Sequence, residues 1–267
     1  MITILTSLAA LAWIATWLAI ALRLRNQTER KPELKLLNIF WLLSLILHST
    51  TLLLPWLKNG AMTIDLPGSL SIVAWLTTFL LFLAHLKRPL ETMGLIVIPG
   101  TLIALVLANG LTQTGNSIIL QNGLGLHIIL SLLAYSMLAL ATLQALLLAT
   151  QNRFLHNHKP NGFIRTLPPL QDMESLLFQL ISAGVILLTL GLLSGLIYLD
   201  GLFGQQVAHK TILSILAWIT FSTLLFGHWR YGWRGKIAIR WTVSGFILLM
   251  LAFWGSKFVI EYLVKQS

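Results

Sequence analysis

Residues 124–150 read LGLHIILSLLAYSMLALATLQALLLAT, an apolar stretch without a single Asp, Glu, Lys or Arg. The hydrocarbon core of a bilayer is about 30 Å thick, and a helix needs about 20 mostly apolar residues to cross it. The apolar residues follow one another continuously instead of alternating as barrel strands do, so helix is the spanning form that fits. This stretch therefore predicts a transmembrane helix.

The rest of the chain has the same character. Of its 267 residues, 57% are hydrophobic and 10% are charged, and the mean hydropathy is +0.83. Soluble domains carry about 25% charged residues, so a soluble domain of any size is excluded. We predict an all-α transmembrane bundle of about eight spans, which forms one integral membrane domain over residues 1–267. The predicted spans are 2–22, 36–57, 69–86, 93–109, 124–150, 176–200, 210–227 and 238–264.

The formal net charge of +10 resides in short clusters between the apolar stretches, not in a segment long enough to form a nucleic-acid-binding face. Four alternate loops hold most of the basic residues: Arg23, Arg25, Arg30, Lys31, Lys35, Lys87, Arg88, Arg153, Lys159, Arg165, Arg230, Arg234, Lys236 and Arg240. The positive-inside rule places such loops in the cytoplasm. We therefore expect a bacterial inner-membrane protein with both termini on the outer, periplasmic side.

Several kinds of chemistry are excluded by residues that the sequence lacks. It has no cysteine, which excludes a dithiol relay, a thiolate metal site and covalent haem attachment through C-x-x-C-H. It also has no H-E-x-x-H pair, P-loop, G-x-S-x-G elbow or paired carboxylates. We predict that the protein is not an enzyme and that it has no metal site apart from any haem iron.

Three histidines are candidate cofactor ligands, because ionisable groups within a membrane are costly and often functional. His48 lies near the middle of the second span, and His127 and His209 begin the fifth and seventh spans on the outer face. A neutral imidazole can ligate haem iron, and a pair of imidazoles fills both axial positions. The alternative is that each ring packs helices together through hydrogen bonds. The other histidines are expected at helix ends or in a polar loop: His85, His228, His156 and His158.

Two structural expectations follow for these three histidines. A charged imidazole at mid-bilayer would cost several kcal/mol, so His48 is expected to be neutral, buried toward the bundle and hydrogen-bonded to a neighbour such as Ser49 or Thr51. His127 and His209 share one membrane face and would converge if their helices are neighbours.

Four segments, in this order along the chain, resemble the cytochrome c assembly family of haem-handling membrane proteins. They are LILHSTTLLLPWLKNG (45–60), LGLHIILSLLAYSMLALA (124–141), LPPLQDMESLLFQLISAGVILLTLGLLSGLIY (167–198) and the closing helical pair with its W-R-G turn (209–258). The resemblance implies haem as a non-covalent cofactor, with His127 and His48 at family histidine positions.

The sequence also departs from the family pattern. The tryptophan-rich outer loop of haem-handling members is replaced by IYLDGLFGQQVAHKT (197–211), and an intramembrane histidine is replaced by Phe226. A further histidine that follows the family's last span has no counterpart. With that loop absent, haem storage, export or regulation is expected rather than presentation of haem to an apocytochrome.

We therefore predict a membrane-embedded protein of the cytochrome c assembly type that binds haem through His127, with His48 as an intramembrane site and His209 as a replacement partner. The alternative is a non-enzymatic accessory or regulatory subunit of a transporter, for example for divalent-cation efflux, in which the histidines are structural. In both cases the expected partners include the lipid bilayer and possible further membrane proteins, and exclude nucleic acid.

Overall fold

The computed structural model describes residues 2–25, 34–59, 62–63, 66–88, 90–110, 117–118, 122–156, 167–198 and 208–255. Within these ranges the chain is helical, apart from turns and one antiparallel pair of two-residue strands, β1 (Met62–Thr63) and β2 (Ser117–Ile118). Eight helices are long and apolar enough to cross a membrane, which confirms the predicted all-α class with eight spans. They are α1 (Ile2–Arg25), α2 (Leu34–Asn59), α3 (Leu66–His85), α4 (Glu91–Gly110), α5 (Asn122–His156), α7 (Leu170–Tyr198), α8 (Ala208–Tyr231) and α9 (Lys236–Met250).

The helices extend beyond the apolar stretches that predicted them. α5 has 35 residues and α7 begins at Leu170, whereas the sequence predicted a span from 176. At 1.5 Å per residue, α5 is about 52 Å long and exceeds the hydrocarbon thickness. α9 passes into a π-helical turn, η1 (Leu251–Gly255), and the predicted end of the last span at 264 lies outside the described residues.

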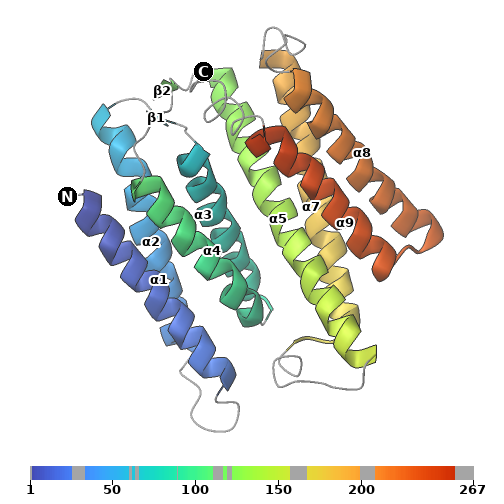
Figure 1. Ribbon diagram of the computed structural model, residues 1–267, viewed down its shortest axis with the longest axis horizontal. Helices are drawn as coiled ribbons and strands as arrows, with labels where there is room; N and C mark the ends of the chain where they lie inside the picture. Colours follow the sequence, from blue (N-terminus) through green and yellow to red (C-terminus); the bar gives the residue numbers. More distant parts are fainter. Residues whose placement is uncertain are drawn as a thin grey trace. The chain divides into compact units, whose positions relative to one another are not determined.

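The chain divides into two compact units, Met1–Leu120 and Gln121–Ser267. In the first unit, α1 packs against α2 and α4, and α3 packs against α4 (Figure 1). Tryptophan N–H groups join these helices: Trp17 Nε1 donates to the Leu95 carbonyl and Trp75 Nε1 donates to the Leu45 carbonyl, each at 3.0 Å. Arg23 and Glu91 form an ion pair at 2.8 Å between α1 and α4, with both side chains largely buried.

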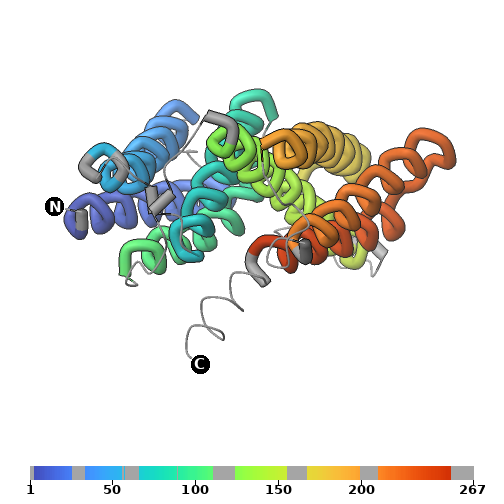
Figure 2. Tube along the Cα trace, turned by 90° about the horizontal axis from the view of Figure 1, so that it is seen from above, coloured from blue at the N-terminus to red at the C-terminus, as the bar shows by residue number. Residues whose placement is uncertain are grey.

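In the second unit, α5 packs along α7 and also contacts α9, while α8 packs against α7 and α9. Figure 2 shows α8 and α9 side by side as a hairpin. α7 can approach α5 closely because it carries glycine at the contact. A Cβ atom at Gly184 would lie 2.5 Å from Leu138 Cδ2, and one at Gly191 would lie 3.4 Å from Ser131 Oγ. This close α5–α7 contact positions the first candidate histidine.

Candidate functional site

His127 lies in the first turns of α5 and faces α7. Its Nδ1 is 2.9 Å from the carbonyl oxygen of Gly191 and 3.2 Å from Ser194 Oγ. The Ser194 hydroxyl donates to the same carbonyl at 2.8 Å. The ring is therefore held at one nitrogen by the backbone and side chain of the neighbouring helix.

These contacts determine the tautomer of His127. A carbonyl oxygen only accepts hydrogen bonds, so Nδ1 carries the proton and Nε2 carries the lone pair. No hydrogen bond to Nε2 is present among the described residues, and the side chain is half-buried. An Nδ1–H donated to a backbone carbonyl is the usual support of a metal-ligating histidine, since it orients the ring and raises the basicity of Nε2. His127 is thus held in the tautomer that a metal-ligating imidazole needs.

The helix that carries His127 is fixed further along its length. Tyr135, two turns after the histidine, is buried and donates its hydroxyl to the Leu249 carbonyl of α9 at 2.5 Å. Further along α5, Gln144 donates to the Met173 carbonyl of α7 at 3.0 Å. Both bonds restrain α5 within the second unit, so the start of the helix has a fixed position relative to Gly191.

His48 occupies a different environment in the first unit. The side chain has no exposed surface, and both ring nitrogens have partners: Trp13 Nε1 donates to Nδ1 at 3.3 Å, and Nε2 is 2.9 Å from Ser71 Oγ. The indole N–H can only donate, so Nδ1 carries the lone pair and Nε2 donates its proton to the serine. The ring is neutral and buried toward the bundle, as predicted.

His48 has the hydrogen-bonding neighbour that was expected, but this neighbour is Ser71, and the two residues named as examples, Ser49 and Thr51, were wrong. Ser49 and Thr51 donate instead to backbone carbonyls three residues earlier in α2, those of Ile46 and His48, at 2.8 and 2.7 Å. Serine and threonine commonly form such bonds within a membrane helix, where no water competes for the carbonyl. The true partners come from α1 and α3, which the local sequence around His48 does not reveal.

The third candidate, His209, begins α8, but its side chain lies outside the described residues. α5 and α8 both pack against α7 and α9. The expected convergence of His127 with His209 stays a prediction.

Sequence reasoning did not identify Gly191, Ser194, Ser71 or Glu91 as partners. The first two stand in a cluster of small residues, Gly191-Leu-Leu-Ser194-Gly195, within a transmembrane helix. Small residues in such helices mark close helix contacts, and this cluster was the available signal for the helix that faces His127. In the part of the chain that the structure describes, no three His, Cys, Asp or Glu side chains gather to hold a metal ion.

Comparisons with known proteins place the whole chain in one family of membrane proteins. The family described as "Cytochrome C assembly protein" matches residues 1–264. The "Inner membrane protein YpjD" of Escherichia coli K12 is 42% identical over 137 residues, and the match spans 51% of this chain and 52% of that protein, about half of each. A 28.8 kDa protein of Azospirillum brasilense is 31% identical over 207 residues, which cover 73% of this chain and 76% of the relative. The "Cytochrome c biogenesis protein CcsA" of Prochlorococcus marinus MIT 9515 is 23% identical over 257 residues, with 84% and 79% covered. No solved structure matches the chain.

Proposed function

The chain belongs to the cytochrome c assembly protein family and is a multi-pass inner-membrane protein, and on this premise we propose that it holds haem non-covalently through His127. Two relatives have printed names that concern cytochrome c biogenesis or haem: CcsA, and the HemX protein of Brevibacillus brevis, which is 25% identical over 142 residues. These names support a haem-related role for this chain.

The observation that carries the proposal is the orientation of the His127 ring. Nδ1–H donates to the Gly191 carbonyl at 2.9 Å, which leaves the Nε2 lone pair for iron. Because this tautomer is set by the fold, the ligand needs no rearrangement of its protons when haem binds. The chain's own contribution is to orient the imidazole and to exclude water with the apolar ends of α5 and α7.

Haem, when bound, supplies the iron centre and its redox chemistry. The described residues provide ligation and an apolar environment, and we assign no bond-making step to them. We therefore propose haem storage, export or regulation as the role, with no enzymatic activity.

The two other candidate ligands rank below His127. His48 would have to break its 2.9 Å bond to Ser71 before Nε2 could reach iron, so we propose it as a secondary, intramembrane position. His209 is proposed as a partner on the outer face, because it begins α8 on the same side on which His127 begins α5 under the predicted topology.

The test is the haem content of the full chain purified in mild detergent, measured from the Soret band per mole of protein. Loss of a residue that hydrogen-bonds to a metal ligand lowers metal affinity about 10–100-fold. His127→Ala removes the ligand itself, so we expect it to lower haem retention by about ten-fold or more. His156→Ala is the matched control, because it removes a histidine from the other end of the same helix. Equal haem in both variants and the parent contradicts ligation by His127.

A further inference from the structure

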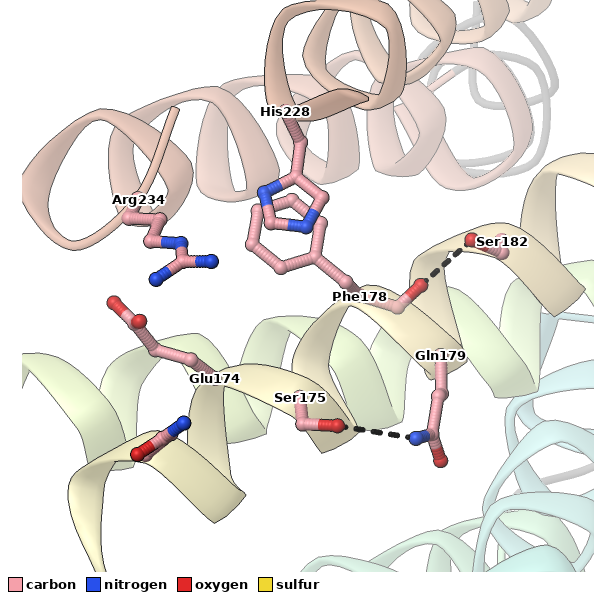
Figure 3. Close-up of a pocket in the computed structure, with 8 residues that line it drawn as sticks. Glu174, Ser175, Phe178, Gln179, Ser182, His228 and Arg234 are labelled. Carbon is pink, nitrogen blue, oxygen red and sulfur yellow. Dashed lines mark hydrogen bonds between the residues drawn. The ribbon is translucent and has the colours of Figure 1, made fainter. Parts of the chain in front are cut away.

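A cavity of about 540 Å³ lies in the second unit, between the beginning of α7 and the end of α8 (Figure 3). It is separate from the His127 site, because its last lining residue on α7, Ser182, precedes Gly191 by nine residues, about 13 Å along the helix. The residues that line it are Gln171, Glu174, Ser175, Phe178, Gln179, Ser182, His228 and Arg234.

The α7 wall of this cavity is polar over three turns of a membrane-spanning helix. Gln171, Ser175, Gln179 and Ser182 recur at intervals of three and four residues, which places them on one helix face. Ser182 donates to the Phe178 carbonyl of its own helix at 2.8 Å, whereas no such bond to the backbone of α7 is present for Gln171, Ser175 or Gln179 among the described residues. Polar side chains in a span are costly when they face lipid, so these three indicate water or a polar ligand at this wall. Figure 3 shows the side chains of Ser175 and Gln179 joined by a hydrogen bond of 3.2 Å.

The opposite wall is the turn between α8 and α9, which is held in one conformation. His228 Nδ1 donates to the Trp233 carbonyl at 2.9 Å, and the imidazole stacks on Phe178 with the ring centroids 3.5 Å apart. Trp233 packs on Gly227, where a Cβ atom would lie 2.3 Å from the indole. Gly235 has a φ of +56°, a conformation that favours glycine, and its N–H donates to Glu174 Oε1 at 2.8 Å. Arg234 is thereby presented at the mouth of the cavity.

Glu174 and Arg234 carry opposite charges, and Figure 3 shows their side chains pointing toward each other across the cavity. Glu174 and Arg234 do not form a direct ion pair, because the ion pair found among the described residues is Arg23–Glu91 in the first unit. A ligand with both an anionic and a cationic group would complement the two walls. A purely anionic ligand would suffer repulsion from Glu174.

Exposed aromatic side chains beside the cavity indicate the source of such a ligand. Trp229 and Tyr231, at the same end of α8, are 81% and 66% exposed. Exposed Trp and Tyr at helix ends mark the level of the lipid headgroups. Arg230 lies over the Tyr231 ring at 5.8 Å, which adds a cation at that level.

We propose that this cavity binds the headgroup of a phospholipid that carries a primary amine, with the phosphate on Arg234 and the ammonium on Glu174. Guanidinium matches phosphate oxygens in a bidentate way, and a carboxylate accepts from an ammonium. The amides of Gln171 and Gln179 and the hydroxyl of Ser175 supply further donors to the phosphate.

The test uses the full chain in detergent with an equimolar mixture of phosphatidylethanolamine and phosphatidylglycerol, and reads bound lipid by native mass spectrometry. An exposed ion pair is worth up to about five-fold in affinity, so the parent is expected to retain phosphatidylethanolamine about five-fold over phosphatidylglycerol. Arg234→Gln is expected to lose both lipids, and Glu174→Gln to lose the preference. The Gln amide oxygen can still accept from Gly235, so this variant keeps the turn. Arg240→Gln, an exposed change on α9 outside the lining, is the control and is expected to match the parent.

Two results of the lipid-retention measurement overturn the proposal. One is equal or greater retention of phosphatidylglycerol by the parent. The other is phosphatidylethanolamine retained by Arg234→Gln at the parental level. Soluble glycerophosphoethanolamine provides a further arm: if it competes as well as the intact lipid at equal concentration, the ligand is not a membrane lipid. Haem content is expected to be unchanged in Glu174→Gln, so failure here and failure of the haem proposal are distinguishable.

Discussion

Each of the two units contains a histidine at a helix contact, and the two rings are used in opposite ways. In the first unit, His48 has no exposed surface and bonds through both nitrogens, to Trp13 and Ser71. In the second, His127 bonds only through Nδ1 among the described residues, and its ring is half-buried. A histidine in the first unit therefore connects helices through both ring nitrogens. A histidine in the second unit keeps the lone pair of Nε2 available. This difference is the reason that we propose the second-unit histidine, His127, as the haem ligand.

The first unit is further stabilised by the buried Arg23–Glu91 pair, and breaking it is expected to have the largest effect. Removing one partner leaves the other charge buried and unpaired, which typically costs about 3–5 kcal/mol. Arg23→Gln should therefore lower the unfolding free energy by roughly that amount, measured by denaturant titration in detergent. The double variant Arg23→Met with Glu91→Met removes both charges and should recover most of the loss. Equal destabilisation in the single and double variants would show that the pair is not the cause.

His48→Ala is expected to be the next most destabilising change. It leaves the N–H of Trp13 and the hydroxyl of Ser71 without their partner in a fully buried place, at a cost of about 2–4 kcal/mol with the cavity included. Haem per folded protein should fall by less than two-fold, because the ring is engaged in structure. Haem loss as large as that of His127→Ala would reverse the comparison between the two histidines.

Gly184→Ala tests the helix contact that positions His127. The new Cβ atom would lie 2.5 Å from Leu138 Cδ2, and overpacking of this kind costs about 1–3 kcal/mol. The expected result is a lower unfolding free energy, largely recovered when Leu138→Ala is added. Gly100→Ala is the matched control, because a Cβ atom there would have nothing within 4 Å and the helix preference for Ala should leave it neutral or slightly stabilising. A similar loss in both glycine variants would count against the close α5–α7 contact.

Ser194→Ala should have the smallest effect. It removes one of two acceptors from His127 Nδ1 but leaves the Gly191 carbonyl at 2.9 Å. We expect haem affinity to fall by about two- to five-fold. This is less than the 10–100-fold loss of metal affinity that follows when a metal ligand loses its hydrogen-bond partners altogether. Haem titration of the purified variant measures this, and no change at all would mean that the carbonyl alone orients the ring.

The eight spans could be predicted from the sequence because bilayer thickness sets the length of each apolar stretch. The ends of the helices could not. α7 begins six residues before its predicted span because Gln171, Asp172 and Glu174 are polar yet continue the helix into the interfacial region. Hydropathy reports where a helix meets hydrocarbon, whereas backbone hydrogen bonding decides where it ends.

The candidate site was partly predictable for a related reason. A histidine within an apolar stretch is conspicuous, so His48 and His127 were found directly from the sequence. Their partners were not, since Gly191 is 64 residues from His127 and Ser71 is 23 residues from His48. Helical periodicity says which residues share a face but not which helix that face meets. The nearby hydroxyls of Ser49 and Thr51 bond to their own helix, and proximity in sequence gave the wrong partners for that reason.

The most direct test of ligation by His127 is rescue by free imidazole. His127→Gly removes the ring while leaving the Gly191 carbonyl in place, so added imidazole can take the same hydrogen bond and present its other nitrogen to iron. The measurement is the Soret band per mole of protein, with and without imidazole, in the parent, His127→Gly and His48→Gly. The account predicts that His127→Gly loses its haem band and regains it with imidazole, while His48→Gly does not respond. Haem retained at the parental level by His127→Gly without imidazole would contradict the account.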